Sequence, residues 1–380
     1  MTVTESPNLA PPPTDLPAME VSARLGRLRD RLDSAGCDAL VVTELTNIRY
    51  LTGFTGSAAM VLVTATDAVF VTDGRYRDRS ADEMAAAGVV ADIRIVTGAA
   101  DEAIAEAALD AGVGRLGLEA DHVSWSAQQR WADQLLPDGD LVATTGVVEA
   151  LRLVKDDGEV ARIRSACAIA DRALAQIRGR LLDGPTEAEF AAELDITMRS
   201  EGAADVSFET IVASGPNGAK PHHTPSDRRI APGDLVVVDF GALVDGYHSD
   251  MTRTVAVGDV GDERTRMLDV VLAAQDAGVH AVRAGVEAAE VDRACRSVIE
   301  DAGWGEAFLH STGHGVGLDI HEEPRVGARS TATLDAGQVV TVEPGVYLTG
   351  LGGVRIEDTV LVTDDGCDRL TLAPKDPILA

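Results

Sequence analysis

The feature that most constrains the fold is the stretch VDFGALVDGYHSDMTRT at 238–254, which continues an apolar run and carries Asp239 and Asp250 near its two ends. Asp245-Gly246 is a hairpin turn signal, because type I′ turns need a positive φ at both central residues. Reversal of the chain there places Asp239 and Asp250 on the same face of paired strands. Two like charges destabilise a half-buried sheet unless a cation lies between them, and a divalent cation with hard oxygen ligands fits best. For this pair alone, the alternative that either aspartate only caps a surface turn stays open.

Two further segments carry groups that can bind a cation. The Gly-rich segment FLHSTGHGVGLDIHEEP places His310, His314 and His321 within 12 positions, although the whole chain has only 8 histidines. Glycines there allow the backbone to approach a bound ion or substrate closely. The segment VVTVEPGVYLTGLGGVRIEDTVLVT predicts a second hairpin, with Glu343 near the end of one β-rich run and Glu357 inside another.

The second hairpin has local features that orient its acidic side chains. The Pro-Gly dipeptide after Glu343 ends that strand and holds the carboxylate at its lip. Alternation along the following run places Arg355 and Glu357 on one face of the strand, with Ile356 on the other. An exposed edge position is the alternative interpretation for Glu357.

Together these segments supply five potential metal ligands, of which four are carboxylates: Asp239, Asp250, His314, Glu343 and Glu357. Four negative charges match two divalent ions. Oxygen-rich ligation with a single imidazole favours Mn, Co or Fe and leaves Zn possible. Two such ions held close together can generate a nucleophile from water at neutral pH.

Charge and cysteine content exclude several other classes of function. The 33 Lys+Arg against 62 Asp+Glu give a formal charge of -29, so we expect no binding to nucleic acid or to anionic membrane surfaces. The four cysteines lie far apart without a C-x-x-C pair, which suits a reducing compartment. The first residues lack the features of a signal peptide, and no later apolar run is long enough to span a membrane. We therefore expect a cytoplasmic protein.

Pattern and proline content divide the chain into three parts. Residues 1–18 are expected to form a disordered tail, since the opening 17 residues contain five prolines and few large apolar groups. Residues 19–150 alternate between strand and helix patterns, which favours a small α/β domain. Residues 151–380 predict two helices, strands, two more helices and more strands, an α+β domain with a weak internal duplication. Its first helix has Asp156 or Asp157 as N-cap, and a Thr186–Glu189 capping box begins the second.

The order and spacing of these motifs resemble those of the pita-bread metallopeptidases, and within them the aminopeptidase P and prolidase branch. The resemblance rests on GPNGAKPHH, DFGALVDGYHSDMTRT, HSTGHGVGLDIHEEP and EPGVYLTGLGGVRIED, and it extends from about Met19 onward. The looser matches NIRYLTGFTGSAA and TDGRYR imply a creatinase-type α/β domain before the catalytic domain. The resemblance implies a dinuclear metal-dependent exopeptidase that hydrolyses the Xaa-Pro bond of dipeptides or peptide N-termini. It also implies a homodimer.

The resemblance further implies roles for the five candidate ligands. Asp239 would bind one metal ion, while His314 and Glu343 would complete the second site. Asp250 and Glu357 would bridge both ions. Manganese is the expected metal, with Co, Fe or Zn as alternatives.

Other residues acquire expected roles on the substrate side of the site. His222, the first histidine of PHH, would contact the substrate near the scissile bond, and His321 would bind its carbonyl or carry a proton. Glu343 would help to move a proton during hydrolysis. Arg325 resembles the arginine that prolidases direct at the substrate carboxylate, although a surface charge is the alternative. Two more residues are expected on the substrate side, His310 and Arg355.

Three alternatives share the same scaffold. A creatinase-like amidinohydrolase works without metal, and a peptide-binding module that has lost catalysis typically loses ligands. The five intact candidate ligands argue against both. Methionine aminopeptidase shares the catalytic core but normally lacks the preceding α/β domain.

Overall fold

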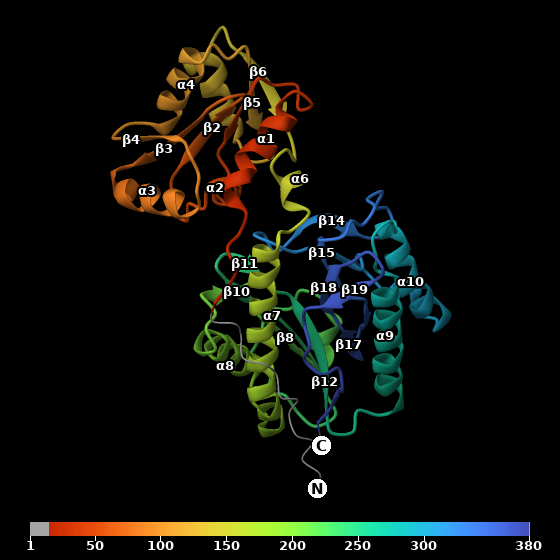
Figure 1. Cartoon of the computed structure of the whole chain (residues 1–380). Coiled ribbons are helices and arrows are strands. Elements are labelled where there is room, and N and C mark those ends of the chain that lie inside the picture. The colour runs from red at the N-terminus through yellow and green to blue at the C-terminus, as the bar shows by residue number, and fades with distance from the viewer. Residues whose placement is uncertain (1–14, 380) are drawn as a thin grey trace. The chain divides into compact units, whose positions relative to one another are not determined.

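The computed structural model describes residues 15–379, so most of the expected disordered tail over residues 1–18 lies outside the described residues. The chain forms two compact units (Figure 1). The N-terminal unit comprises residues 18–152, and the C-terminal unit comprises residues 153–379 together with the short segment 15–17.

The N-terminal unit contains a six-stranded mixed sheet in the order β4-β3-β2-β1-β5-β6. β1 pairs antiparallel with β2 but parallel with β5, as strand and helix alternate along the chain. The strands are β1 (Ala39–Val42), β2 (Met60–Thr64), β3 (Ala68–Asp73), β4 (Asp92–Val96), β5 (Arg115–Glu119) and β6 (Asp140–Thr144). The helices are η1 (Val21–Ala23), α1 (Arg24–Leu32), α2 (Leu45–Thr52), η2 (Gly74–Tyr76), α3 (Arg77–Ala86), α4 (Ala100–Asp110), α5 (Trp125–Arg130), η3 (Trp131–Leu135) and α6 (Glu149–Arg152). A buried cluster that includes Leu62, Val71, Ile104 and Trp131 forms the core.

The C-terminal unit combines helices with a four-stranded sheet, β20-β12-β9-β8, and a five-stranded sheet, β14-β13-β15-β18-β19. A three-stranded sheet, β11-β10-β7, and the hairpin β16-β17 complete it. The helices are α7 (Asp157–Ile177), η4 (Arg178–Asp183), α8 (Glu187–Ser200), η5 (Gly215–Ala219), α9 (Asp262–Ala281), α10 (Ala288–Asp301) and η6 (Gly305–Ala307). The strands are β7 (Asp205–Val206), β8 (Ile211–Ser214), β9 (Leu235–Phe240), β10 (Ala242–Val244), β11 (Tyr247–His248), β12 (Met251–Val257), β13 (Gly313–Gly315), β14 (Glu322–Val326), β15 (Val339–Val342), β16 (Gly345–Leu348), β17 (Gly352–Arg355), β18 (Asp358–Val362), β19 (Cys367–Arg369) and β20 (Ile378–Leu379).

Two capping boxes begin the first helix pair. The Asp156 side chain accepts a hydrogen bond from Glu159 N, and the Glu159 side chain accepts one from Asp156 N, so Asp156 is the N-cap of α7. Thr186 and Glu189 form the predicted equivalent at α8. Both boxes satisfy backbone donors that the first turn of a helix leaves free.

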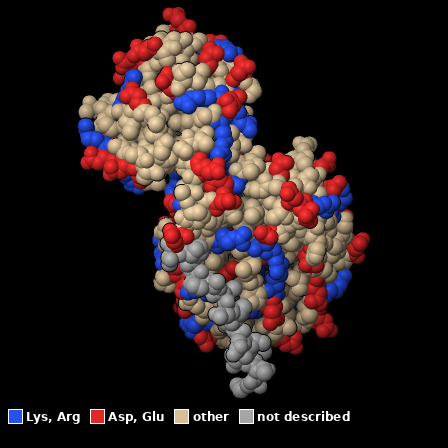
Figure 2. All heavy atoms as spheres, in the orientation of Figure 1, with Lys and Arg blue, Asp and Glu red and all other residues tan. Residues whose placement is uncertain are grey.

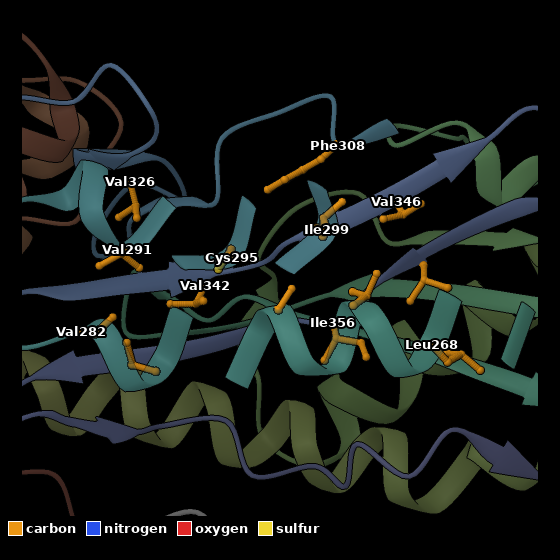
Figure 3. Close-up of a cluster of buried hydrophobic side chains, with 14 of the residues drawn as sticks. Leu268, Val282, Val291, Cys295, Ile299, Phe308, Val326, Val342, Val346 and Ile356 are labelled. Atoms are coloured by element: carbon orange, nitrogen blue, oxygen red, sulfur yellow. The ribbon is translucent and has the colours of Figure 1, made fainter. Parts of the chain in front are cut away.

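Each helix pair packs on its own sheet through a buried apolar cluster. α7 and α8 contribute residues such as Ile169 and Phe190 to a cluster with β8, β9 and β12. α9 and α10 pack on the five-stranded sheet and on β16-β17 (Figure 3). Gly278 permits the close approach of α9, since a Cβ there would lie 2.3 Å from the Cys295 sulfur and 2.7 Å from Val342. The predicted α+β domain with repeated helix pairs is confirmed.

The stretch 238–254 folds as two nested pairs of strands instead of one continuous hairpin. Asp245 and Gly246 have φ of 46° and 77°, as the predicted tight turn requires, and join β10 to β11. The extended strand is interrupted at Gly241, where a Cβ would lie 1.9 Å from the backbone oxygen of Ser249. β9 and β12 therefore pair separately from β10 and β11, in the four-stranded sheet.

The surface of each unit carries interspersed acidic and basic side chains on the face shown in Figure 2. Among residues 15–379, no helix is both long and apolar enough to cross a membrane. All four cysteines are free, and three of them are buried.

Candidate metal centre

A cavity of about 630 Å³ in the C-terminal unit brings the candidate residues together. Its volume lies in the range typical of small-molecule sites. All ten residues singled out from the sequence line it: His222, Asp239, Asp250, His310, His314, His321, Arg325, Glu343, Arg355 and Glu357. Their common location is therefore established, whereas their individual roles stay predictions.

The five candidate ligands come from both sheets of the unit. Asp239 lies in β9 and Asp250 directly precedes β12, in the four-stranded sheet. His314 lies in β13, Glu343 directly follows β15, and Glu357 directly precedes β18, in the five-stranded sheet. Strand ends from the two sheets thus meet at one point.

His314 lies at the centre of this cluster. Its Nε2 atom is 3.5 Å from Asp250 Oδ2 and 3.4 Å from Glu343 Oε1. Potential ligand atoms of Asp250, His314 and Glu357 all lie within 4.8 Å of one another. The Nδ1 atom of His314 donates to the carbonyl oxygen of Gly315 at 3.0 Å, which leaves the Nε2 lone pair free for a metal. Burial lowers the pKa of His314 to about 4, so its imidazole is neutral, as ligation requires.

The cluster fits divalent cations on two further observations. Asp239 Oδ1 and Glu357 Oε1 are buried and accept no hydrogen bond from any described residue. A buried carboxylate oxygen without a partner is costly unless a cation satisfies it. Burial, and then the negative charges of neighbouring carboxylates, raise the pKa of Asp250 and of Glu357 well above the usual range. A cation between these groups removes both penalties.

Glu357 lies in the break between β17 and β18, so the expectation that it belongs to a strand is wrong. The chain leaves the β16-β17 hairpin at Arg355 and enters the five-stranded sheet at Asp358. The break is held by Thr252 of β12, whose carbonyl oxygen accepts from Glu357 N at 3.1 Å and whose hydroxyl donates to Glu357 Oε2 at 2.7 Å. Thr252 was not predicted as a site residue from the sequence, although strand alternation places it on the same face as Asp250.

Arg355 connects the cluster to His310 through Tyr347. Its guanidinium donates to Asp239 Oδ2 at 2.5 Å and to the Tyr347 hydroxyl at 2.8 Å. That hydroxyl lies 2.9 Å from His310 Nε2, while His310 Nδ1 donates to the carbonyl oxygen of Ser311. The three side chains form one buried chain of hydrogen bonds that fixes Asp239. No sequence signal pointed to Tyr347, since nothing local distinguishes it from a core tyrosine.

Three of the residues expected to face a substrate are exposed in the cavity. His222, His321 and Arg325 are exposed, and the His321 ring lies 4.4 Å from the His314 ring, centre to centre. Glu322, the residue after His321, pairs with the buried ammonium of Lys155 at 2.9 Å. This ion pair holds the segment that leads into His321. No described residue forms a hydrogen bond or ion pair with the Arg325 guanidinium, so its charge is available to a ligand.

Two protein-family models match the chain. The model described as metallopeptidase family M24 matches residues 161–364, and the model of the creatinase/prolidase N-terminal domain matches residues 24–154. These matches cover the C-terminal and the N-terminal unit respectively.

Individual proteins are similar over nearly the whole chain. A peptidase of Bacillus subtilis described as uncharacterized is 39% identical over 94% of this chain and 99% of its own length. The solved structure of an Xaa-Pro dipeptidase from Bacillus anthracis superposes with a TM-score of 0.91 at 40% identity, covering 94% of this chain and 100% of that chain. An X-Pro aminopeptidase from Thermotoga maritima gives a TM-score of 0.84 at 35% identity, over 92% and 99% of the two chains. The similarity therefore includes both units.

Proposed function

The chain belongs to the metallopeptidase family M24, and on that premise we propose that it is a metal-dependent exopeptidase cleaving the Xaa-Pro bond of dipeptides or of peptide N-termini. The observation that carries the proposal is the cluster of four carboxylates and one imidazole, in which two buried carboxylate oxygens accept no hydrogen bond from any residue in 15–379. Proline specificity is supported by the similar structures from B. anthracis and T. maritima, which are described as an Xaa-Pro dipeptidase and an X-Pro aminopeptidase. They differ over substrate length, so both lengths belong to the proposal.

The five clustered residues would hold two divalent ions: Asp239, Asp250, His314, Glu343 and Glu357. When bound, such ions polarise a carbonyl group and generate a nucleophile from water at neutral pH. Manganese is the metal we propose, because one imidazole among oxygen ligands favours Mn, Co or Fe.

The remaining groups of the cavity would bind the peptide and move protons. His321 and His222 would direct imidazole N–H groups at the oxygen of the scissile carbonyl and stabilise the charge that develops there. Glu343 would take a proton from the attacking water and deliver it to the proline nitrogen, which receives the electron pair of the breaking bond. Arg355 would orient the Asp239 carboxylate through their hydrogen bond.

A substrate comparison tests the proposed function. The manganese-loaded protein should hydrolyse an Xaa-Pro dipeptide or an Xaa-Pro-initiated peptide at least about tenfold faster, in kcat/KM, than the matching Xaa-Ala substrate, because the cavity would select the proline ring by shape. Creatine is the third substrate, and we expect no turnover of it. Equal rates on the proline and alanine substrates would contradict the proposed specificity, and turnover of creatine would favour an amidinohydrolase.

Arg325 allows a second test, which separates dipeptides from longer peptides. If its unpaired guanidinium binds the C-terminal carboxylate of a dipeptide, the charge-assisted contact contributes about 2 kcal/mol, or roughly thirtyfold in kcat/KM. Arg325→Ala should then lower kcat/KM for Xaa-Pro dipeptides by that factor and spare longer peptides, whose carboxylate lies elsewhere.

The matched control is Arg329→Ala, which removes an exposed arginine that does not line the cavity. It should leave both substrates unaffected. An equal loss on both substrates in Arg325→Ala would indicate damage to the site, and no loss on either would leave a preference for longer peptides as the better proposal.

Two finer points extend the proposal. We propose a homodimer on the resemblance to the peptidases above, which light scattering of the purified protein would test.

A cytoplasmic location is supported by the four free thiols, because cysteines without disulfides are typical of reducing compartments. Formation of a disulfide in the protein isolated from its own cell would contradict it.

A further inference from the structure

Glu187 carries a fully buried carboxylate that is not among the residues lining the cavity. It is the first residue of α8, directly after the N-cap Thr186. Its burial is unusual for a glutamate, since such groups are almost never buried unless they are paired. Its partners therefore indicate what it does.

Six donor atoms surround the Glu187 carboxylate. Oε1 accepts from the Ser214 amide at 2.7 Å, from the Ser214 hydroxyl at 2.6 Å and from Asn217 Nδ2 at 3.1 Å. Oε2 accepts from His223 Nε2 at 2.8 Å, from the Ser226 amide at 3.1 Å and from the Ser226 hydroxyl at 2.5 Å. Oε1 thus faces the end of β8 and η5, whereas Oε2 faces the segment that follows η5 and also accepts from Asn217 Nδ2 at 3.2 Å.

The carboxylate is an ionised acceptor at neutral pH. Burial alone would raise the pKa of Glu187, but the hydrogen bonds from Ser214, Ser226 and His223 outweigh it and lower the pKa to about 2. Hydrogen bonds to a charged acceptor are stronger than those between neutral groups. Because the acceptor is ionised, His223 Nε2 carries the hydrogen in this contact.

The segment that Glu187 reaches forms one wall of the cavity. Residues 221–225, which include His222 and His223, all line it. Among the described residues these five take part in no backbone–backbone hydrogen bond, and they belong to no helix or strand. Side-chain contacts therefore hold the wall, namely Glu187 through His223 and a longer bond of 3.4 Å from Arg355 to the Pro221 carbonyl oxygen.

Glu187 also joins this wall to α8 and β8. Directly after the wall, Ser226 gives its amide and its hydroxyl to Glu187, while its carbonyl oxygen accepts from Ala188 N of α8. On the other side, Ser214 lies in β8, whose backbone is paired with β9. The carboxylate therefore links the paired strand β8 to a wall that has no backbone–backbone hydrogen bonds among the described residues.

We propose that Glu187 is a positioning residue, which through His223 and Ser226 fixes the cavity wall 221–225 and thereby the imidazole of His222. The inference rests on the proposed function, in which His222 contacts the substrate. A group displaced by about 1 Å from its productive position can cost a large factor in rate, so loss of the link reduces catalysis without touching the metal ligands.

Two serine variants form a matched pair that tests the inference. Ser226→Ala and Ser214→Ala each remove one hydroxyl bond to the same carboxylate, but only Ser226 adjoins the wall. Neither serine lines the cavity. We expect Ser226→Ala to lower kcat/KM for an Xaa-Pro dipeptide about tenfold relative to Ser214→Ala, with unchanged metal content in both.

Two glutamate variants add a second comparison on the same helix turn. Glu187→Gln presents an amide NH₂ to donors and should lower kcat/KM further than Ser226→Ala. Glu189→Gln removes an exposed carboxylate from the same first turn of α8 and should leave kcat/KM unchanged. If Glu187→Gln does not fold, the serine pair decides.

A readout that is independent of activity is the NMR spectrum of the zinc-loaded protein with ¹³C-labelled histidine, of which the chain has 8. The His222 ring signal, assigned with His222→Gln, should shift or broaden in Ser226→Ala and stay unchanged in Ser214→Ala and Glu189→Gln. Unchanged His222 signals together with equal kcat/KM in the serine pair would overturn the inference. If the unaltered protein hydrolyses no Xaa-Pro substrate, the proposed function fails, and the His222 signal still decides whether Glu187 positions the wall.

Discussion

Removal of divalent metal is expected to abolish turnover of Xaa-Pro substrates, and added Mn²⁺ is expected to restore it. Four carboxylates line one cavity, and Asp239 Oδ1 and Glu357 Oε1 have no hydrogen-bond partner among the described residues. Without a cation, burial and mutual repulsion raise the pKa of Asp250 and of Glu357 and favour their neutral forms. A protonated carboxyl group binds metal poorly. Without the metal ion, the site also loses the group that would hold the peptide.

The measurement is turnover before and after chelation, with elemental analysis of the same samples. Metal should also stabilise the folded chain by mass action, about 2.7 kcal/mol at a free concentration a hundredfold above Kd. Glu357→Gln serves as control, because added Mn²⁺ should restore neither its activity nor its stability to the level of the unaltered protein. Full activity of a sample that elemental analysis finds metal-free would refute the metal requirement.

Much of the site could be predicted because its residues lie at positions fixed by local rules. The Asp245-Gly246 turn sets the register in which Asp239 opposes Thr252, and alternation then places Asp250 on the same face. The Pro-Gly after Glu343 ends β15 directly beside that residue. Side-chain alternation along a strand and the residue preferences of turns both act within a few residues. They can therefore be predicted without knowledge of the tertiary structure.

The supporting contacts could not be predicted in the same way, because they join residues far apart in sequence. Tyr347 acquires its role only where Arg355 and His310 meet it. Glu187 carries only a local signal, a position beside a capping residue, whereas its partners lie 27 to 39 residues further along the chain. Such pairs depend on how the sheets meet, and one sequence does not contain that information in any local pattern.

Substitution of Asp358 by asparagine is expected to cost about 3–5 kcal/mol of the free energy of unfolding of the C-terminal unit. Asp358 is fully buried directly after Glu357, and its carboxylate pairs with Arg253 at 3.0 Å and with Lys375 at 2.5 Å. Gln275 and Thr371 also donate to it. Asp358→Asn keeps the size of the side chain but removes the charge, so two largely buried cations lose their counter-ion.

Native-state hydrogen exchange along the ladder between β15 and β18 measures this loss in the C-terminal unit alone, since Val342 pairs with Asp358 there. Asp368→Asn is the matched control, because Asp368 and its partner Arg164 are both exposed and lie 3.9 Å apart. Pairs of exposed charges contribute little, so this control should exchange like the unaltered protein. Equal exchange in both variants would show that hydrogen bonds from Thr371 and Gln275 suffice without the charge.

Because Thr252, and not Asp358, holds the Glu357 carboxylate, Asp358→Asn should still bind metal at temperatures where it remains folded. The two adjacent acidic residues would then have different roles. Asp358 would stabilise the fold, whereas Glu357 would bind metal.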